Sequence, residues 1–164
     1  MRTLVGIVLD YLRQLAWFLA ASTGVGALVT FVLPLLGYAT FGDRPGPGWY
    51  GPPSSMSWAG IRRSAEYALA LPVFGAMPAV FYFAVPYVVV RLLERTRVPR
   101  YAVRLVGALL CAAAAFVVLA GAGWYISLGA VAGAAGIIGG AIYGARTLPR
   151  TMVASPEAAG APAV

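Results

Sequence analysis

Histidine and lysine are both absent from this 164-residue sequence, and cysteine occurs once, as Cys111. Without histidine, the chain lacks the commonest metal ligand and the usual acid–base group near neutral pH. A single cysteine excludes an internal disulfide and any iron–sulfur or cysteine-based zinc framework. We therefore expect no metal site and no cofactor, and a haem held by histidine is excluded.

Charged residues are also scarce. They make up 10% of the chain, 61% of the residues are hydrophobic, and the mean hydropathy is +0.83. A soluble domain usually carries about 25% charged residues, so this chain has too few to cover a globular surface. Residues 105–145 are a run of 41 residues without a charge, which as one helix extends about 60 Å, roughly twice the hydrocarbon thickness of a bilayer. The run must fold back on itself, and the sequence predicts an all-α integral membrane protein.

Four apolar segments have lengths close to the roughly 20 residues that a membrane-spanning helix needs. They cover residues 17–36, 67–90, 105–125 and 127–145, and they predict a four-transmembrane-helix bundle in a single membrane domain, residues 1–150. Apolar residues recur at helical spacing in residues 3–15, which indicates an amphipathic helix leading into the first span rather than a cleaved signal peptide. Residues 151–164 are rich in alanine, proline and glycine and predict a disordered tail.

The twelve cations are all arginine, and their distribution along the chain is uneven. Nine of them precede the first span, join the second span to the third, or follow the fourth, whereas Arg44, Arg62 and Arg63 fall on the other side. Because arginine-rich segments stay in the cytoplasm, both termini are predicted to be cytoplasmic and the loop 37–66 to be external. The arginine-only, alanine-rich and glycine-rich composition indicates a GC-rich genome, so we expect the cytoplasmic (inner) membrane of a bacterium.

Glycines recur at intervals of four residues in the last span. Gly136, Gly140 and Gly144 share one face of the helix, and Gly129 and Gly133 form a neighbouring stripe. A phosphate-binding P-loop is excluded because it requires a lysine. The spacing is similar to that of glycine-zipper helices, whose backbones approach other helices closely. This face is predicted to pack either against the other spans of the same chain or against a second copy or a partner protein.

Three prolines interrupt the second span: Pro72, Pro78 and Pro86. Each removes a backbone donor and clashes with the preceding turn, so we expect kinks at these positions. Their spacing would divide the span into short straight pieces. These pieces either form a hinge or a broken helix around a substrate site, or only improve the static fit of the helix in the bundle.

Five arginines lie between the second and third spans: Arg91, Arg95, Arg97, Arg100 and Arg104. They either bind anionic lipid head groups or act only as the signal that keeps this segment inside. A segment this short has no extended basic surface, so nucleic-acid binding is not expected.

The four predicted spans contain no ionisable residue other than tyrosine and the single cysteine. Coupled transporters and intramembrane enzymes need acids, bases or nucleophile–base pairs at such positions. We therefore predict no catalytic residue and no enzyme activity. The expected role is that of an accessory or assembly subunit of a larger membrane complex, with the lipid bilayer and other membrane subunits, or itself, as partners. Two alternatives are a small homo-oligomeric transporter or channel and a membrane immunity protein against a toxin.

Overall fold

The computed structural model of the chain describes residues 4–41, 57–121 and 130–149. The elements in these ranges are α1 (Leu4–Leu19), the π-helical segment η1 (Ala20–Gly24), α2 (Val25–Phe41), α3 (Trp58–Tyr82), α4 (Ala84–Leu93), α5 (Arg100–Gly121) and α7 (Ala130–Arg146). Within these ranges there is no strand, which confirms the prediction of an all-α fold.

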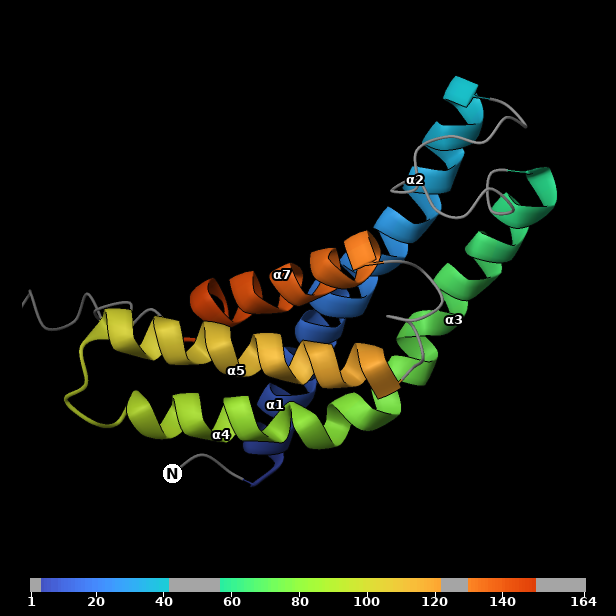
Figure 1. The fold of residues 1–164 in the computed structure, drawn as a ribbon. Coiled ribbons are helices and arrows are strands. Elements are labelled where there is room, and N and C mark those ends of the chain that lie inside the picture. The colour runs from blue at the N-terminus through green and yellow to red at the C-terminus, as the bar shows by residue number, and fades with distance from the viewer. Residues whose placement is uncertain (1–3, 42–56, 122–129, 150–164) are drawn as a thin grey trace, which may run out of the picture.

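The first helix runs without interruption over 38 residues, because α1, η1 and α2 follow one another directly. It is about 57 Å long at roughly 1.5 Å per residue, so the predicted amphipathic segment and the first span belong to one rod (Figure 1). In the π turn, the hydroxyls of Ser22 and Thr23 donate to the carbonyl oxygens of Phe18 and Leu19, both at 2.7 Å. Hydroxyls that bond to the preceding turn compete with the backbone hydrogen bonds there and bend helices.

The second predicted span is interrupted, since Phe83 separates α3 from α4. Pro86 explains where the break falls, because it has no N–H to donate to the carbonyl oxygen of Tyr82, four residues earlier. The next residue resumes the helical pattern, and Tyr87 N donates to the Phe83 carbonyl oxygen at 3.1 Å. Figure 1 shows that α3 and α4 run in different directions on either side of this break.

The helices form a layer and an arm. In the layer, α5 lies between α4 and α7, and α1 crosses all three (Figure 1). In the arm, α2 and the first half of α3 lie beside each other and extend away from the layer. The break at Phe83 turns α4 onto the layer, while α3 stays with α2.

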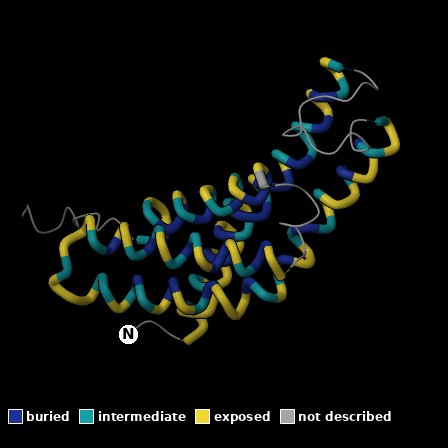
Figure 2. The backbone as a smooth tube through the Cα atoms, viewed as in Figure 1, coloured by how far each residue is buried: buried dark blue, intermediate teal, exposed yellow. Residues whose placement is uncertain are grey.

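The core lies where α1 meets the layer. The rings of Phe18 and Phe83 stack with their centroids 4.8 Å apart, and the Tyr143 ring lies 6.0 Å from both. These aromatic groups belong to the first helix, the break and α7, so they hold together segments that are far apart in the sequence. Figure 2 shows buried residues on the inner faces of the helices and exposed residues along the outside.

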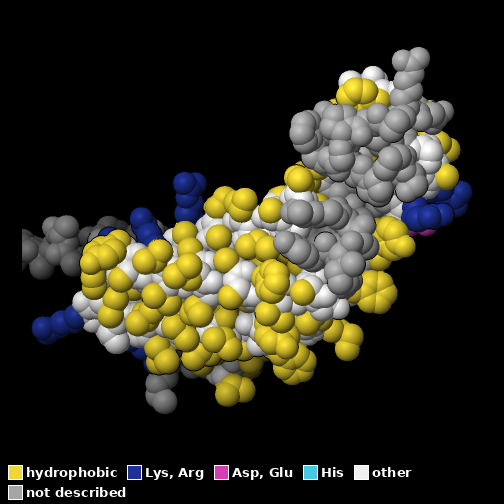
Figure 3. Space-filling view, viewed as in Figure 1, with side chains coloured by type: hydrophobic (Ala, Val, Ile, Leu, Met, Phe, Trp, Pro, Cys, Tyr) yellow, Lys and Arg dark blue, Asp and Glu magenta, His cyan; other side chains and the backbone are white. Residues whose placement is uncertain are grey.

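Three helices in the described ranges are long and apolar enough to cross a membrane: Leu4–Phe41, Trp58–Tyr82 and Arg100–Gly121. α7 has 17 residues, which is the lower limit for a span. Apolar side chains cover the face seen in Figure 3, and arginine side chains gather towards its ends. These helices and this surface are those of a multi-pass membrane protein. The predicted turn between the third and fourth spans and the predicted tail, 151–164, lie outside the described residues.

Candidate functional site

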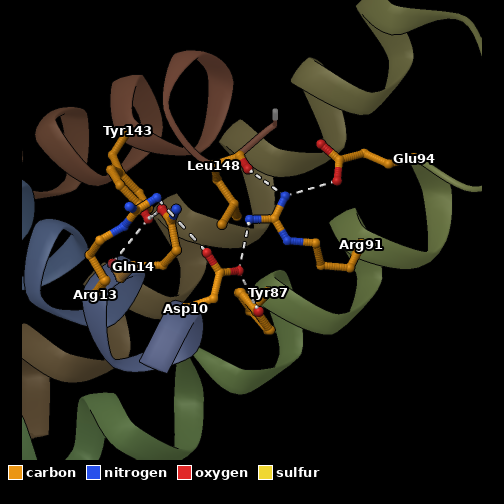
Figure 4. A network of polar contacts seen from close by, with 8 residues as sticks. All are labelled: Asp10, Arg13, Gln14, Tyr87, Arg91, Glu94, Tyr143 and Leu148. Atoms are coloured by element: carbon orange, nitrogen blue, oxygen red, sulfur yellow. Dashed lines mark hydrogen bonds and ion pairs between the residues drawn. The ribbon is translucent and has the colours of Figure 1, made fainter. Parts of the chain in front are cut away.

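A cluster of polar side chains joins α1, α4 and the segment after α7 (Figure 4). At its centre, Arg91 Nη1 donates to Glu94 Oε2 at 2.8 Å and to the carbonyl oxygen of Leu148 at 3.1 Å. Arg91 Nη2 lies 3.6 Å from Asp10 Oδ2. The same carboxylate oxygen accepts a 2.8 Å hydrogen bond from the Tyr87 hydroxyl. One guanidinium group thus connects α1 and α4 with the segment that follows α7.

The charges in this cluster are shielded from solvent and balanced. The side chains of Arg91, Asp10 and Glu94 are 15%, 11% and 20% exposed. A second arginine, Arg13, places Nη2 3.9 Å from Asp10 Oδ1. Two arginines therefore balance two carboxylates, and this matters because an unpaired shielded charge is strongly destabilising.

A second polar contact connects α1 to α7. The hydroxyl of Tyr143 lies 2.6 Å from Gln14 Oε1 and 2.9 Å from the Gln14 backbone oxygen, and both residues are buried. Asp10 and Gln14 are four residues apart and therefore share one face of α1. This face places its carboxylate against α4 and its amide against α7.

The polar contacts join elements that are far apart in the sequence. Asp10 and Glu94 each form an ion pair with Arg91, which also donates to the Leu148 carbonyl oxygen, so these contacts connect α1 and α4 with the segment after α7. Among the described residues, no three histidine, cysteine, aspartate or glutamate side chains come close enough together to hold a metal ion.

Two of the predicted packing glycines lie against α5 of the same chain. At Gly140, an added Cβ would lie 2.8 Å from Ala115 Cβ and 3.1 Å from the Cys111 carbonyl oxygen. At Gly144, an added Cβ would collide with the backbone of Gly107. The partner residues on α5 are small and four residues apart, and this spacing is a signal in the sequence that our prediction did not use.

The other glycines of the last span differ in their surroundings. Gly133 and Gly136 are buried in α7, and Gly129 lies outside the described residues. Gly139 is on neither predicted stripe, yet an added Cβ there would collide with the carbonyl oxygen of Ala21 in η1. The close approach of α7 to the first helix was missed because Gly139 falls outside the four-residue repeat.

Among the three predicted kink positions, Pro86 is next to the break. It is buried in the first turn of α4. The N–H groups of a first turn have no partner within the helix, so proline is tolerated there. Pro72 and Pro78 lie inside α3, which continues through both.

The five arginines predicted to contact lipid occupy two different environments. Arg91 faces the carboxylates and the carbonyl oxygen described above, so its partners belong to the protein itself. The other four, Arg95, Arg97, Arg100 and Arg104, are exposed around the turn from α4 to α5.

Asp10, Gln14, Tyr87 and Tyr143 were not among the predicted site residues. The sequence did contain one signal: Asp10 and Gln14 are polar and lie four residues apart in the amphipathic segment, residues 3–15. Their partners lie 77 and 129 positions away in the sequence, and the spacing within one helix does not encode such contacts.

No protein-family model, curated protein or solved structure matches this chain. Its function is therefore inferred from the geometry of its own residues.

Proposed function

We propose that the chain is a non-catalytic, four-span protein of a bacterial cytoplasmic membrane and serves as an accessory or assembly subunit of a larger membrane complex. The four crossings are the continuous first helix, the broken helix α3–α4, α5, and α7, with both termini in the cytoplasm. The uneven distribution of arginine, nine of twelve on one side, supports this orientation.

The observation that carries the proposal is the outer face of α3. Five large apolar side chains follow one another along this face, and each is at least 68% exposed: Leu69, Val73, Phe74, Met77 and Phe81. The opposite face packs inside the protein, where Leu71, Gly75 and Ala79 are buried. The flexible methionine side chain adapts well to the surface of a partner. A continuous stripe of this kind supports packing against a helix of another subunit.

The polar cluster supports a structural role rather than a transport role. Asp10, Arg91 and Glu94 connect α1 and α4 with the segment after α7 and are mostly shielded from solvent. A proton or ion carrier needs such groups to change partners during its cycle. A subunit that presents a fixed surface needs them to stay paired.

The exposed arginines at the turn between α4 and α5 add a lipid contact to this role. In the proposed orientation, Arg95, Arg97, Arg100 and Arg104 lie at the cytoplasmic head groups, where they attract anionic lipids.

Site-specific photo-crosslinking tests the subunit proposal. A benzophenone amino acid replaces Phe74 on the outer face of α3 or, as the matched control, Leu109, which is exposed on α5. We expect a discrete protein adduct from position 74 and only lipid adducts from position 109, each identified by mass spectrometry. Lipid adducts alone at both positions would reject the subunit role, and an adduct of twice the chain mass would indicate a homo-oligomer instead.

A further inference from the structure

A lateral groove with a volume of about 600 Å³ runs between the first helix and α7. Trp17, Ala20 and Ala21 line one wall, and Ile138, Gly139 and Ile142 line the other. The two backbones touch at the floor, because a Cβ at Gly139 would collide with the Ala21 carbonyl oxygen. Trp17, Ile138 and Ile142 are each more than half exposed, so the groove opens to the outside of the protein. Its volume lies within the roughly 300–1,000 Å³ that is typical of small-molecule sites.

Each wall of the groove continues into an arginine. On α1, Arg13 precedes Trp17 by four residues, and on α7, Arg146 follows Ile142 by four residues. Residues four apart share a helix face, so each arginine extends the face that lines the groove. Both arginines are exposed.

The two arginines stand at the same end of the groove, because the helices run antiparallel there. Tyr143 contacts Gln14, whereas Gly139, one turn earlier in α7, meets Ala21, two turns later in the first helix. Moving towards the end of α7 therefore means moving towards the start of α1. In the close-up of Figure 4, Arg13 and Gln14 on α1 lie next to Tyr143 on α7.

We propose that this groove binds an anionic phospholipid, with an acyl chain along the apolar walls and the phosphate between Arg13 and Arg146. A phospholipid combines the two features that the groove requires, an apolar chain and an anion at one end. Arg13 lies 3.9 Å from the Asp10 carboxylate, which also faces Arg91 and Tyr87. The Arg13 side chain is 69% exposed, so it can reach an anion as well, and Arg146 adds a second exposed cation. The inference requires a membrane position for these helices and is independent of the proposed subunit role.

Trp17 is a natural probe of this groove. A variant that carries Trp49→Phe, Trp58→Phe and Trp124→Phe retains Trp17 as its single tryptophan. It is reconstituted in phosphatidylcholine vesicles with a minor, equal fraction of either phosphatidylglycerol or phosphatidylcholine that carries bromine on the acyl chains. Because two cations face the head group, we expect the brominated phosphatidylglycerol to quench Trp17 with a relative affinity on the order of tenfold higher.

Two charge variants of this single-tryptophan protein separate a specific site from general attraction to an anionic surface. Arg13→Gln combined with Arg146→Gln is expected to abolish the preference for phosphatidylglycerol. Arg62→Gln combined with Arg63→Gln removes the same number of charges near the start of α3, away from the groove, and is expected to retain the preference. Protection of the Cys111 thiol from a maleimide shows that each variant is folded. Equal quenching by the two lipids, or a preference that survives loss of Arg13 and Arg146, would overturn the proposal.

Discussion

Two ion pairs of similar chemistry differ in their surroundings in this protein. The Arg91–Asp10 pair is shielded between α1 and α4, whereas the Arg62–Glu66 pair, with Nε and Oε1 3.2 Å apart, is exposed along α3. An exposed pair contributes little to stability because water solvates both charges well. In the shielded pair, removal of one partner leaves the other charge without compensation. Comparing substitutions in the two pairs therefore measures how much shielding from solvent adds to the effect of an ion pair on stability.

We expect Asp10→Asn to lower the free energy of unfolding by about 1–3 kcal/mol, because it leaves Arg91 with one carboxylate fewer. Glu66→Gln should lower it by less than about 1 kcal/mol. Denaturation in mild detergent gives both values. The double variant Asp10→Asn with Arg91→Gln should lose less than the sum of the two single variants, since the two residues interact directly. Equal losses at the shielded and exposed pairs would contradict the geometry of the cluster.

The close contact of α5 and α7 depends on the absence of a side chain at Gly144. An added Cβ there would lie 2.7 Å from Cys111 Cβ and would collide with the backbone of Gly107. We expect Gly144→Ala to destabilise the protein by about 1–3 kcal/mol through overpacking. Cys111 is the single cysteine and is buried, so a dye that reacts with thiols as the protein unfolds on heating reports the change as a lower melting temperature.

Gly121→Ala is the matched control for this prediction, because an added Cβ there would have no neighbour within 4 Å among the residues that the structure describes. Alanine has a higher helix propensity than glycine by up to about 1 kcal/mol, so this variant should be neutral or slightly more stable. The two substitutions are chemically identical, and we expect opposite signs. If both raise the melting temperature, the contact between α5 and α7 is not close in the folded protein.

At the scale of whole elements, the broken helix α3–α4 determines the shape of the protein. Pro86→Ala restores a donor to the carbonyl oxygen of Tyr82, and we expect the helix to become straighter. Spin labels at Leu69→Cys and Leu92→Cys, in a Cys111→Ala background, report the change by pulsed electron paramagnetic resonance. A straight helix would separate these positions by about 35 Å at roughly 1.5 Å per residue, so the distance should lengthen towards that value. Pro72→Ala, inside the uninterrupted α3, should leave it unchanged.

The existence of the helices could be predicted from the sequence, because length and apolar composition define a membrane-spanning segment. Their ends were less predictable. α5 begins at Arg100, whereas the predicted third span begins at residue 105, and α2 continues to Phe41 beyond the predicted end at residue 36. An apolar run indicates which residues cross hydrocarbon, but backbone hydrogen bonding continues into charged or polar turns beyond it.

The sequence predicted kinks or breaks at three prolines but not which of them would interrupt the helix, and it did not predict the polar cluster. Pro72, Pro78 and Pro86 have the same local effect on a helix, but only Pro86 is next to a break. There the break lets α4 pack on α5, so tertiary contacts select among the three positions. In the same way, Asp10 reaches Arg91 only because α1 crosses α4. The spacing of apolar residues in one helix does not predict where it crosses another helix.

At the scale of the whole molecule, the distribution of arginine predicts the orientation in the membrane. Reporter fusions after Thr96 and after Arg150 should fluoresce as cytoplasmic fusions, and a fusion after Gly46 should show periplasmic phosphatase activity. Because the segments around residues 96 and 150 carry most of the arginines, reversing the orientation would place them outside. A cytoplasmic signal at Gly46 would contradict the proposed topology.

The last prediction concerns coupled transport by the whole protein. Transport driven by protons or sodium needs a group whose charge or coordination changes during the cycle. Asp10 and Glu94 are the shielded acids in the described ranges, and both contact Arg91, so a change in either would disrupt contacts between helices. We therefore expect vesicles that contain the purified protein to show no uptake of ions, sugars or cationic dyes under a pH or sodium gradient. Vesicles with Asp10→Asn are the matched control and should show the same passive leak. Gradient-driven uptake that disappears in Asp10→Asn or Glu94→Gln would contradict the subunit role and identify the cluster as part of an ion pathway.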